Sequence, residues 1–398
     1  MIPALRREFN RNFSSDKYQS FLSALDRRCG THIKFRVAET PCFFPRVLIE
    51  QMSQYGQELL GQLLNSDEYR RHSDGTIPAE YNVPSESERP MFVQVDFGLL
   101  RSSSGEIEPK LVELQAFPSL YAYQPALMQQ YVESFGLDAH LGGFLSGLDC
   151  KTYRRMLTRA IVGNHAPENV VLMEIDPLEQ KTLPDFLLTE KLCGIDSVNV
   201  LDLRKQGRKL YRKKHGRTIP VERIYNRMII DEVMRKGINL PFDLRDELDI
   251  EWAGHPNWYF RISKFSLPFL QHRCVPRTWF LDQLPGLPPD RENYLLKPLY
   301  SFAGVGIKFG PSDADVAEIP QERRQEYILQ ERMRFEPVIE TPEGPTQAEV
   351  RIMYIWPEED APQPIPVLTL VRMGRGKMMG VDHNRNLSWV GGSAGFWV

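Results

Sequence analysis

Two consecutive stretches carry acidic and amide side chains at a spacing that suits metal binding. In VQVDFGLL (93–100) and KLVELQAF (110–117), apolar and polar residues alternate, and the serine-rich turn between them predicts a β-hairpin. Because side chains alternate along a strand, Asp96 shares a face with Gln94, and Glu113 shares a face with Gln115. If these faces align, Asp96, Glu113 and Gln115 offer the oxygen ligands that Mg²⁺ prefers. The alternative is a hairpin with one solvated face.

A glycine-rich stretch, LLKPLYSFAGVGIKFG (295–310), is the second candidate. A turn here would bring Lys297 and Lys308 towards a common point. Backbone N–H groups at Gly304 and Gly306 could approach phosphate oxygens, because no Cβ intervenes. The glycine spacing matches neither the Rossmann nor the Walker pattern, so a simple hairpin is the alternative.

Three arginines lie in strand-like segments. Arg227 follows a strand in RIYNRMI (223–229), Arg351 shares a face with Glu349 in AEVRIMYI (348–355), and Arg372 lies in LVRMGRGK (370–377). A guanidinium can bind a carboxylate or phosphate through two hydrogen bonds. For Arg227 the alternative is a surface residue of an edge strand, and for Glu349 and Arg351 it is a structural ion pair.

Composition excludes several classes of protein. The net charge of -3 and the pI near 6.3 argue against a nucleic-acid-binding protein. No apolar run approaches the ~20 residues that span a bilayer, and the N-terminus is too polar for a signal peptide. The five cysteines are scattered without CxxC spacing, so we expect neither disulfides nor zinc, and a cytoplasmic location. The sequence contains no Ser-His or Cys-His motif, so we do not expect a protein nucleophile.

The elements that must position these residues divide the chain into four parts. We predict a helical N-terminal region (1–88), the hairpin with helices (89–160), a small parallel βαβ subdomain (161–245), and a mainly antiparallel C-terminal domain (246–398). The βαβ prediction depends on the buried-strand pattern NVVLMEI, the amphipathic segment LPDFLLTEKLCG and a second strand, SVNVLDL. The fold class is therefore mixed, α+β with an α/β insertion.

The motifs, taken in order, resemble those of ATP-grasp ligases of the eukaryotic glutathione synthetase and glutathionylspermidine synthetase type, including circularly permuted ATP-grasp proteins. In that group an Asp-Phe strand precedes a turn, then PKLLE and an amide residue, which is similar to VDFGLLRSSSGEIEPKLVELQ (95–115). The family's KP loop with glycines resembles the stretch at Lys297, and its hinge segment resembles YILQERM (327–333). Its Leu-Arg-Thr-Lys segment and final glycine loop resemble LVRMGRGK and GGSAGFWV (391–398).

The resemblance implies an ATP-grasp fold, in which antiparallel sheets grip the nucleotide, and roles for individual residues. ATP would be bound by Lys264, Lys297, Gly304, Gly306, Lys308, Gln330 and Glu331. Mg²⁺ would be bound by Asp96, Glu113, Gln115 and Glu349. Arg227, Arg351 and Arg372 would neutralise charge during catalysis, and residues 391–395 would be substrate or lid residues.

The implied activity is an ATP-dependent carboxylate–amine ligase that forms an amide through an acyl phosphate. Its partners would be small carboxylates and amines, without nucleic acid or membrane, and a homodimer is the expected assembly. One departure matters: the family has a glutamate inside its KP loop, whereas LYSFA (299–303) contains no acid. Two alternatives therefore stay open, a non-catalytic nucleotide-binding homologue and an ATP-grasp phosphotransferase.

Overall fold

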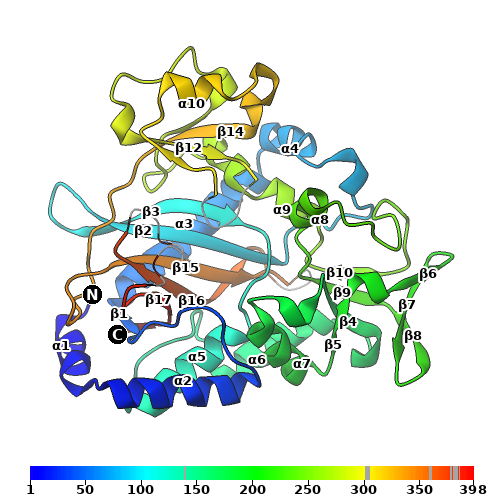
Figure 1. The fold of residues 1–398 in the computed structure, drawn as a ribbon, viewed down its shortest axis with the longest axis horizontal. Helices are drawn as coiled ribbons and strands as arrows, with labels where there is room; N and C mark the ends of the chain where they lie inside the picture. Colours follow the sequence, from blue (N-terminus) through cyan, green and yellow to red (C-terminus); the bar gives the residue numbers. More distant parts are fainter. Residues whose placement is uncertain (139, 301–304, 358–360, 377–378, 380–383, 385) are drawn as a thin grey trace.

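The computed structural model describes the chain except residues 139, 301–304, 358–360, 377–378, 380–383 and 385. The predicted site residue Gly304 lies outside the described part. Figure 1 shows a central antiparallel sheet, a small lobe above it, and a layer that combines a parallel sheet with helices on the other side. Both ends of the chain lie close together at one edge of the central sheet.

The central sheet has five strands in the order β17-β16-β15-β2-β3. Its strands are β2 (Phe92–Arg101), β3 (Ile107–Gln115), β15 (Gln347–Ile355), β16 (Ile365–Gly374) and β17 (Gly391–Ser393). The predicted hairpin is confirmed, because β2 and β3 pair antiparallel with Asp96 opposite Glu113. Val93, Val95 and Phe97 are fully buried on one face, which leaves the other face for polar side chains.

The N-terminal region is helical, as predicted. It contains α1 (Pro3–Asn12), α2 (Ser15–Cys29), α3 (Arg46–Leu64) and α4 (Asp67–Asp74). The hydroxyl of Ser14 caps α2 by accepting from the Lys17 backbone N–H, and Gly30 ends the helix in the left-handed conformation. The predicted apolar stripe of α3 is buried against the central sheet and comprises Leu48, Met52, Tyr55, Leu59 and Leu63.

A four-stranded parallel sheet forms the second layer, in the order β10-β9-β4-β5. Its strands are β4 (Val170–Glu174), β5 (Asp196–Asn199), β9 (Arg223–Asn226) and β10 (Glu251–Ala253). The helices of this part of the chain are α5 (Tyr123–Phe135), α6 (Cys150–Val162), α7 (Leu183–Cys193), α8 (Ile230–Lys236) and α9 (Asn257–Arg261). Because α7 connects two parallel neighbours, β4 and β5, the predicted βαβ unit is confirmed.

The basic run between Arg204 and Arg217 forms a three-stranded antiparallel sheet. Its strands are β6 (Arg204–Gln206), β7 (Lys209–Lys214) and β8 (Arg217–Val221). Acidic neighbours partly neutralise it: Lys205 lies 2.6 Å from Asp246, and Arg208 lies 2.8 Å from Asp249.

The small lobe contains the second antiparallel sheet, in the order β11-β14-β12-β13. Its strands are β11 (Thr278–Phe280), β12 (Tyr294–Pro298), β13 (Lys308–Phe309) and β14 (Tyr327–Glu331), and it carries α10 (Asp313–Ala317). Leu296 and Leu329 belong to a small core of this lobe. Strand alternation therefore turns Leu295 and Lys297 to the opposite face.

The C-terminal glycine run, predicted as substrate or lid residues, lies in two short buried strands. After β17, strand β18 (Gly395–Trp397) pairs parallel with β1 (Cys42–Phe44). The N–H of Ala38 donates to the carbonyl of Gly392, and the N–H of Gly392 donates to the carbonyl of Arg36. The N-terminal segment thus holds this run in place. In the described part of the chain, no helix combines the length and apolar character needed to cross a membrane.

Candidate functional site

Charged side chains gather on the face of the central sheet opposite α3. Strand register places them as direct neighbours: Asp96 lies between Glu113 on β3 and Arg351 on β15, and Glu349 lies opposite Arg372 on β16. Asp96, Glu349, Arg351 and Arg372 follow the period of two that leaves the α3 face apolar. Glu113 reaches the same face through a bulge at Val112, because Leu111 and Leu114 both pack on the α3 side. Sequence spacing predicted the convergence of Asp96 and Glu113, and the register confirms it.

Two arginines engage the carboxylates. Arg351 donates from Nε to Oδ1 of Asp96 at 2.5 Å and from Nη2 to Oδ2 at 2.7 Å, a bidentate arrangement. Its Nη1 donates to Oε1 of Gln94 at 2.6 Å. Arg372 contacts Asp96 through Nη2 and donates from Nε to Oε1 of Glu349 at 2.7 Å. The sequence suggested that Glu349 and Arg351 could pair with each other. In the structure, Arg351 pairs with Asp96 and Glu349 pairs with Arg372.

Because these carboxylates are buried, they need their arginine partners to remain charged in the folded protein. The side chain of Asp96 is 1% exposed and that of Glu349 is 9% exposed. Burial would raise the pKa of Asp96, but Arg351 and Arg372 outweigh it, so the pKa lies below its ordinary value. For Glu349, burial prevails over Arg372 and is reinforced by Asp96 and Glu113, so its pKa is raised. An unpaired charge at this depth would cost several kcal/mol, about 3–5 when one partner is removed.

The small lobe contributes Lys297, Gln330 and Lys264. Lys297 is 6% exposed, and its Nζ donates to Oε1 of Gln330 at 2.5 Å. Nζ of Lys264 lies 3.4 Å from the carbonyl oxygen of Leu299. Burial lowers the pKa of Lys297 to about 8; Glu113 opposes this shift, Lys264 adds to it, and Glu349 opposes it. Lys297 is thus within electrostatic reach of acids on the central sheet.

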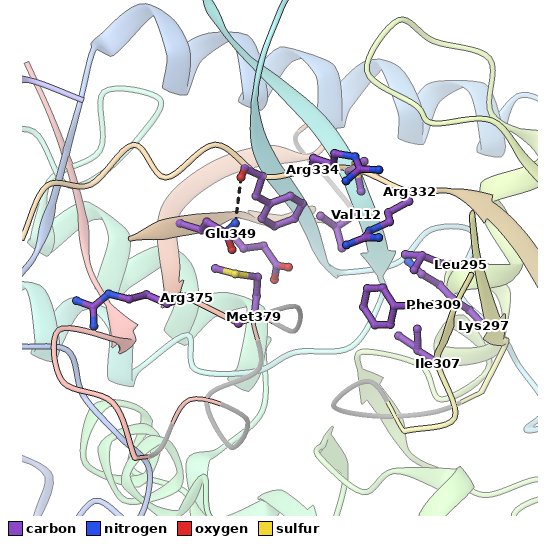
Figure 2. Close-up of a pocket in the computed structure, with 14 residues that line it drawn as sticks. Val112, Leu295, Lys297, Ile307, Phe309, Arg332, Arg334, Glu349, Arg375 and Met379 are labelled. Carbon is purple, nitrogen blue, oxygen red and sulfur yellow. Dashed lines mark hydrogen bonds between the residues drawn. The ribbon is translucent and has the colours of Figure 1, made fainter. Parts of the chain in front are cut away.

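A cavity of about 410 Å³ lies between the two antiparallel sheets. Lys297 and Glu349 line it from opposite sheets (Figure 2). The rest of the wall combines apolar side chains with Gln347 and three arginines, Arg332, Arg334 and Arg375. The apolar residues are Val112, Leu295, Ile307, Phe309, Met333, Phe335 and Met379. This combination of an apolar wall and a few polar groups is typical of small-molecule sites.

Three predicted residues lie away from this cluster. Arg227 is 2% exposed and pairs with Asp185 at 2.6 Å, while its Nε is buried without a hydrogen-bond partner among the described residues. Lys308 is exposed and lies 3.1 Å from Asp315. Glu331 is 41% exposed and pairs with Arg277.

The contacts of Arg227 indicate a structural role. The carboxylate of Asp185 also accepts from the backbone N–H groups of Leu120, Ala122 and Tyr123, and so caps the start of α5. Gly306 lies in an exposed turn, with φ of +79°. The structure therefore brings together the central-sheet residues with Lys264, Lys297 and Gln330.

The predicted metal ligands are engaged by protein donors. Asp96 and Glu349 accept from arginines, and Glu113 accepts from the amide of Gln115. Among the described residues, no group of three or more His, Cys, Asp or Glu side chains could hold a metal ion. In this arrangement the residues do not fit Mg²⁺.

The sequence did not predict the contribution of Gln94 to the site or the pairing of Asp185 with Arg227. Gln94 supports Arg351, and a signal for it was present, since it shares the face of Asp96 two residues away. Asp185 could not be found in this way, because it lies 42 residues from Arg227 in the chain. Arg375 was noted in the sequence and lines the cavity (Figure 2), while its guanidinium is held by Thr341, Thr346 and the carbonyl of Ser388.

Comparison with known proteins gives a match in structure alone. Neither a protein-family description nor a curated protein matches the sequence. Among solved structures, the fold is similar to a glutathione synthetase-like effector (GSS30) from Globodera pallida in its apo form. The TM-score is 0.60 at 13% sequence identity, over 96% of this chain and 97% of that one. The chain therefore has a glutathione synthetase-like fold of mixed α and β structure.

Proposed function

We propose that the protein binds ATP in the cavity between its two antiparallel sheets and uses it to join a small carboxylate to an amine. The observation that carries this proposal is the position of Lys297. It is a buried cation on the wall of a cavity of about 410 Å³, within electrostatic reach of Glu113 and Glu349. Burial of an ammonium group is costly unless anions lie near it, and a nucleotide phosphate would add an anion to Glu113 and Glu349.

The rest of the cavity suits the other parts of a nucleotide. Its apolar residues, such as Phe309 and Phe335, offer a surface for a purine ring. Gln330 is fully buried, accepts from Nζ of Lys297 and donates to Oγ1 of Thr278, so its side chain holds Lys297 in position. The glutathione synthetase-like fold makes ligation the reaction class of first choice, as an expectation from fold similarity.

Ligation needs charge stabilisation and positioning, and no protein nucleophile. The carboxylate oxygen attacks the γ-phosphorus of ATP and ADP leaves, which gives an acyl phosphate. The amine nitrogen then attacks the acyl carbon, phosphate leaves, and the amine gives up a proton. Lys297, Arg351 and Arg372 are the cations that would offset the charge on the transferred phosphoryl group.

The second candidate is a non-catalytic nucleotide-binding protein. One observation favours it: Asp96 and Glu349 are both paired with Arg372. The Mg²⁺ that the resemblance implies would have to compete with this guanidinium.

ADP release distinguishes the two candidates. The purified chain would be incubated with ATP and with pairs drawn from amino acids, dipeptides and polyamines, and ADP would be measured by a coupled assay. Ligation predicts ADP release only when both a carboxylate and an amine are present. ATP binding without ADP release across the whole panel would overturn the ligase assignment in favour of the non-catalytic one.

A further inference from the structure

We propose that the guanidinium of Arg372 takes the place of a divalent cation between Asp96 and Glu349, so that nucleotide binding by this chain does not depend on Mg²⁺. This inference rests on the proposed nucleotide site and concerns how that site is charged. It starts from the contacts of a single nitrogen atom. Nη2 of Arg372 contacts Oδ2 of Asp96 and lies 2.5 Å from Oε1 of Glu349.

A metal ion and this nitrogen exclude one another. Mg²⁺ requires oxygen ligands at about 2.0–2.1 Å in octahedral geometry. An ion bound to the same two carboxylate oxygens would lie within van der Waals contact of Nη2. Two cations at that separation repel strongly in a buried site. The carboxylates of Asp96 and Glu349 can therefore accept Arg372 or the metal, and they accept Arg372 in the structure.

Arg372 is the more exposed of the two arginines. Its side chain is 22% exposed, whereas that of Arg351 is 7% exposed and is also held by Gln94. Arg351 alone still offers Asp96 a bidentate partner when Arg372 is removed. Removal of Arg372 should consequently open an oxygen-lined position between Asp96, which keeps Arg351, and Glu349, which loses its contact with Arg372 and can then bind the metal.

The missing acid of LYSFA agrees with this substitution. Because LYSFA (299–303) contains no acid, it adds no carboxylate that could help to attract a divalent cation. The sequence departure and the arginine bridge are separate observations with the same consequence. The protein's own cations, Arg372 and Lys297 among them, would then balance the nucleotide phosphates.

The test measures metal binding without nucleotide. Mn²⁺ would be titrated into the wild-type chain and into Arg372→Met, Arg372→Gln and Arg372→Lys, and free Mn²⁺ followed by electron paramagnetic resonance. Arg372→Met and Arg372→Gln should bind Mn²⁺ at concentrations comparable with the protein, whereas the wild type and Arg372→Lys should not. Arg101→Met is the matched control, because Arg101 lies on β2 in an exposed pair with Glu336, and it should behave as wild type.

A second arm measures ATP affinity by calorimetry with Mg²⁺ and with EDTA. For the wild type the two dissociation constants should agree within about threefold, and for Arg372→Met Mg²⁺ should strengthen binding by about tenfold or more. The inference is overturned if the wild type binds Mn²⁺ as well as Arg372→Met does, or if its ATP affinity requires Mg²⁺. The wild-type arm decides this even if the variants do not fold. Absence of ATP binding in every chain, with the Mn²⁺ result as expected, would reject the nucleotide site and leave the arginine substitution standing.

Discussion

At the scale of single residues, Lys297 connects the fold to the proposed function. Its charge state depends on its burial, which lowers the pKa of its ammonium group from 10.5 to about 8. A lysine whose pKa falls on folding carries its buried charge at a cost below pH 8, and it loses the proton as pH rises through 8. Only the protonated form attracts a phosphate. The titration of Lys297 should therefore be visible in nucleotide binding.

We expect the affinity for ATP to be highest below pH 8 and to weaken above it, approaching about tenfold per pH unit. Calorimetric dissociation constants at pH 7 and pH 9 measure this change. Lys297→Arg is the control, since a guanidinium keeps its charge over this range and should give a nearly flat profile. The same decline in Lys297→Arg would assign the effect to another group.

Residue types and spacing predicted much of the cluster but not its pairing. Strand alternation singled out Asp96, Glu113, Glu349 and Arg351, and the family resemblance singled out Arg372. Which arginine pairs with which acid depends on the order of the strands in the sheet. Strand β15 lies between β2 and β16, and β2 is far from both β15 and β16 in the sequence. The buried pairing of Arg227 is a tertiary contact that local pattern cannot reveal.

At the scale of elements, a run of glycines did not distinguish a loop from closely packed strands. The run from Gly391 to Gly395 was predicted as substrate or lid residues because it resembles the family's final glycine loop, whereas in this structure the run packs closely in short strands. A Cβ at Gly391 would lie 2.6 Å from the carbonyl oxygen of Arg36, and its φ is +120°. In contrast, the hairpin β2–β3 and the βαβ unit were predicted correctly, because their periodicity is local.

Gly391→Ala should destabilise the fold beyond the cost of its backbone conformation. The control is Gly216→Ala, since Gly216 has φ of +76° and no atom within 4 Å of its Cβ position. We expect the control to lose about 1–2 kcal/mol from left-handed strain and Gly391→Ala to lose a further ~1–3 kcal/mol from overpacking. Urea denaturation measures both losses of stability. Equal losses would show that the backbone at Arg36 can move away from the added Cβ without a cost in free energy.

At the scale of the whole molecule, the first residues of the chain complete the fold around its last ones. Phe9 on α1 is 5% exposed, and its ring lies 4.9 Å from that of Phe135 and 6.3 Å from that of Phe43. The same hydrophobic cluster includes Trp389 and Phe396. The N-terminal region showed no functional motif, and its packing gives it a structural task. A homodimer and a cytoplasmic location stay predictions from the sequence.

Phe9→Ala should therefore reduce the free energy of unfolding by about 3–5 kcal/mol, the usual cost of removing a buried aromatic ring. The affinity for ATP should not change, because the cavity lies between the two antiparallel sheets, away from α1. Val47→Ala is the control: Val47 is 71% exposed and its truncation should cost less than about 0.5 kcal/mol. A parallel loss of ATP binding in folded Phe9→Ala would show that this region contributes to the site.

Calorimetric titration of ATP tests whether the nucleotide binds at Lys297. The wild type, Lys297→Met and Lys308→Met would be compared, since Lys308 is an exposed lysine of the same lobe paired with Asp315. We predict that the wild type and Lys308→Met bind one ATP with similar affinity. Lys297→Met, checked for folding by circular dichroism, should bind at least about tenfold more weakly, the loss of one charge-assisted hydrogen bond. Equal affinity in Lys297→Met, or no binding by the wild type, would contradict the proposed site.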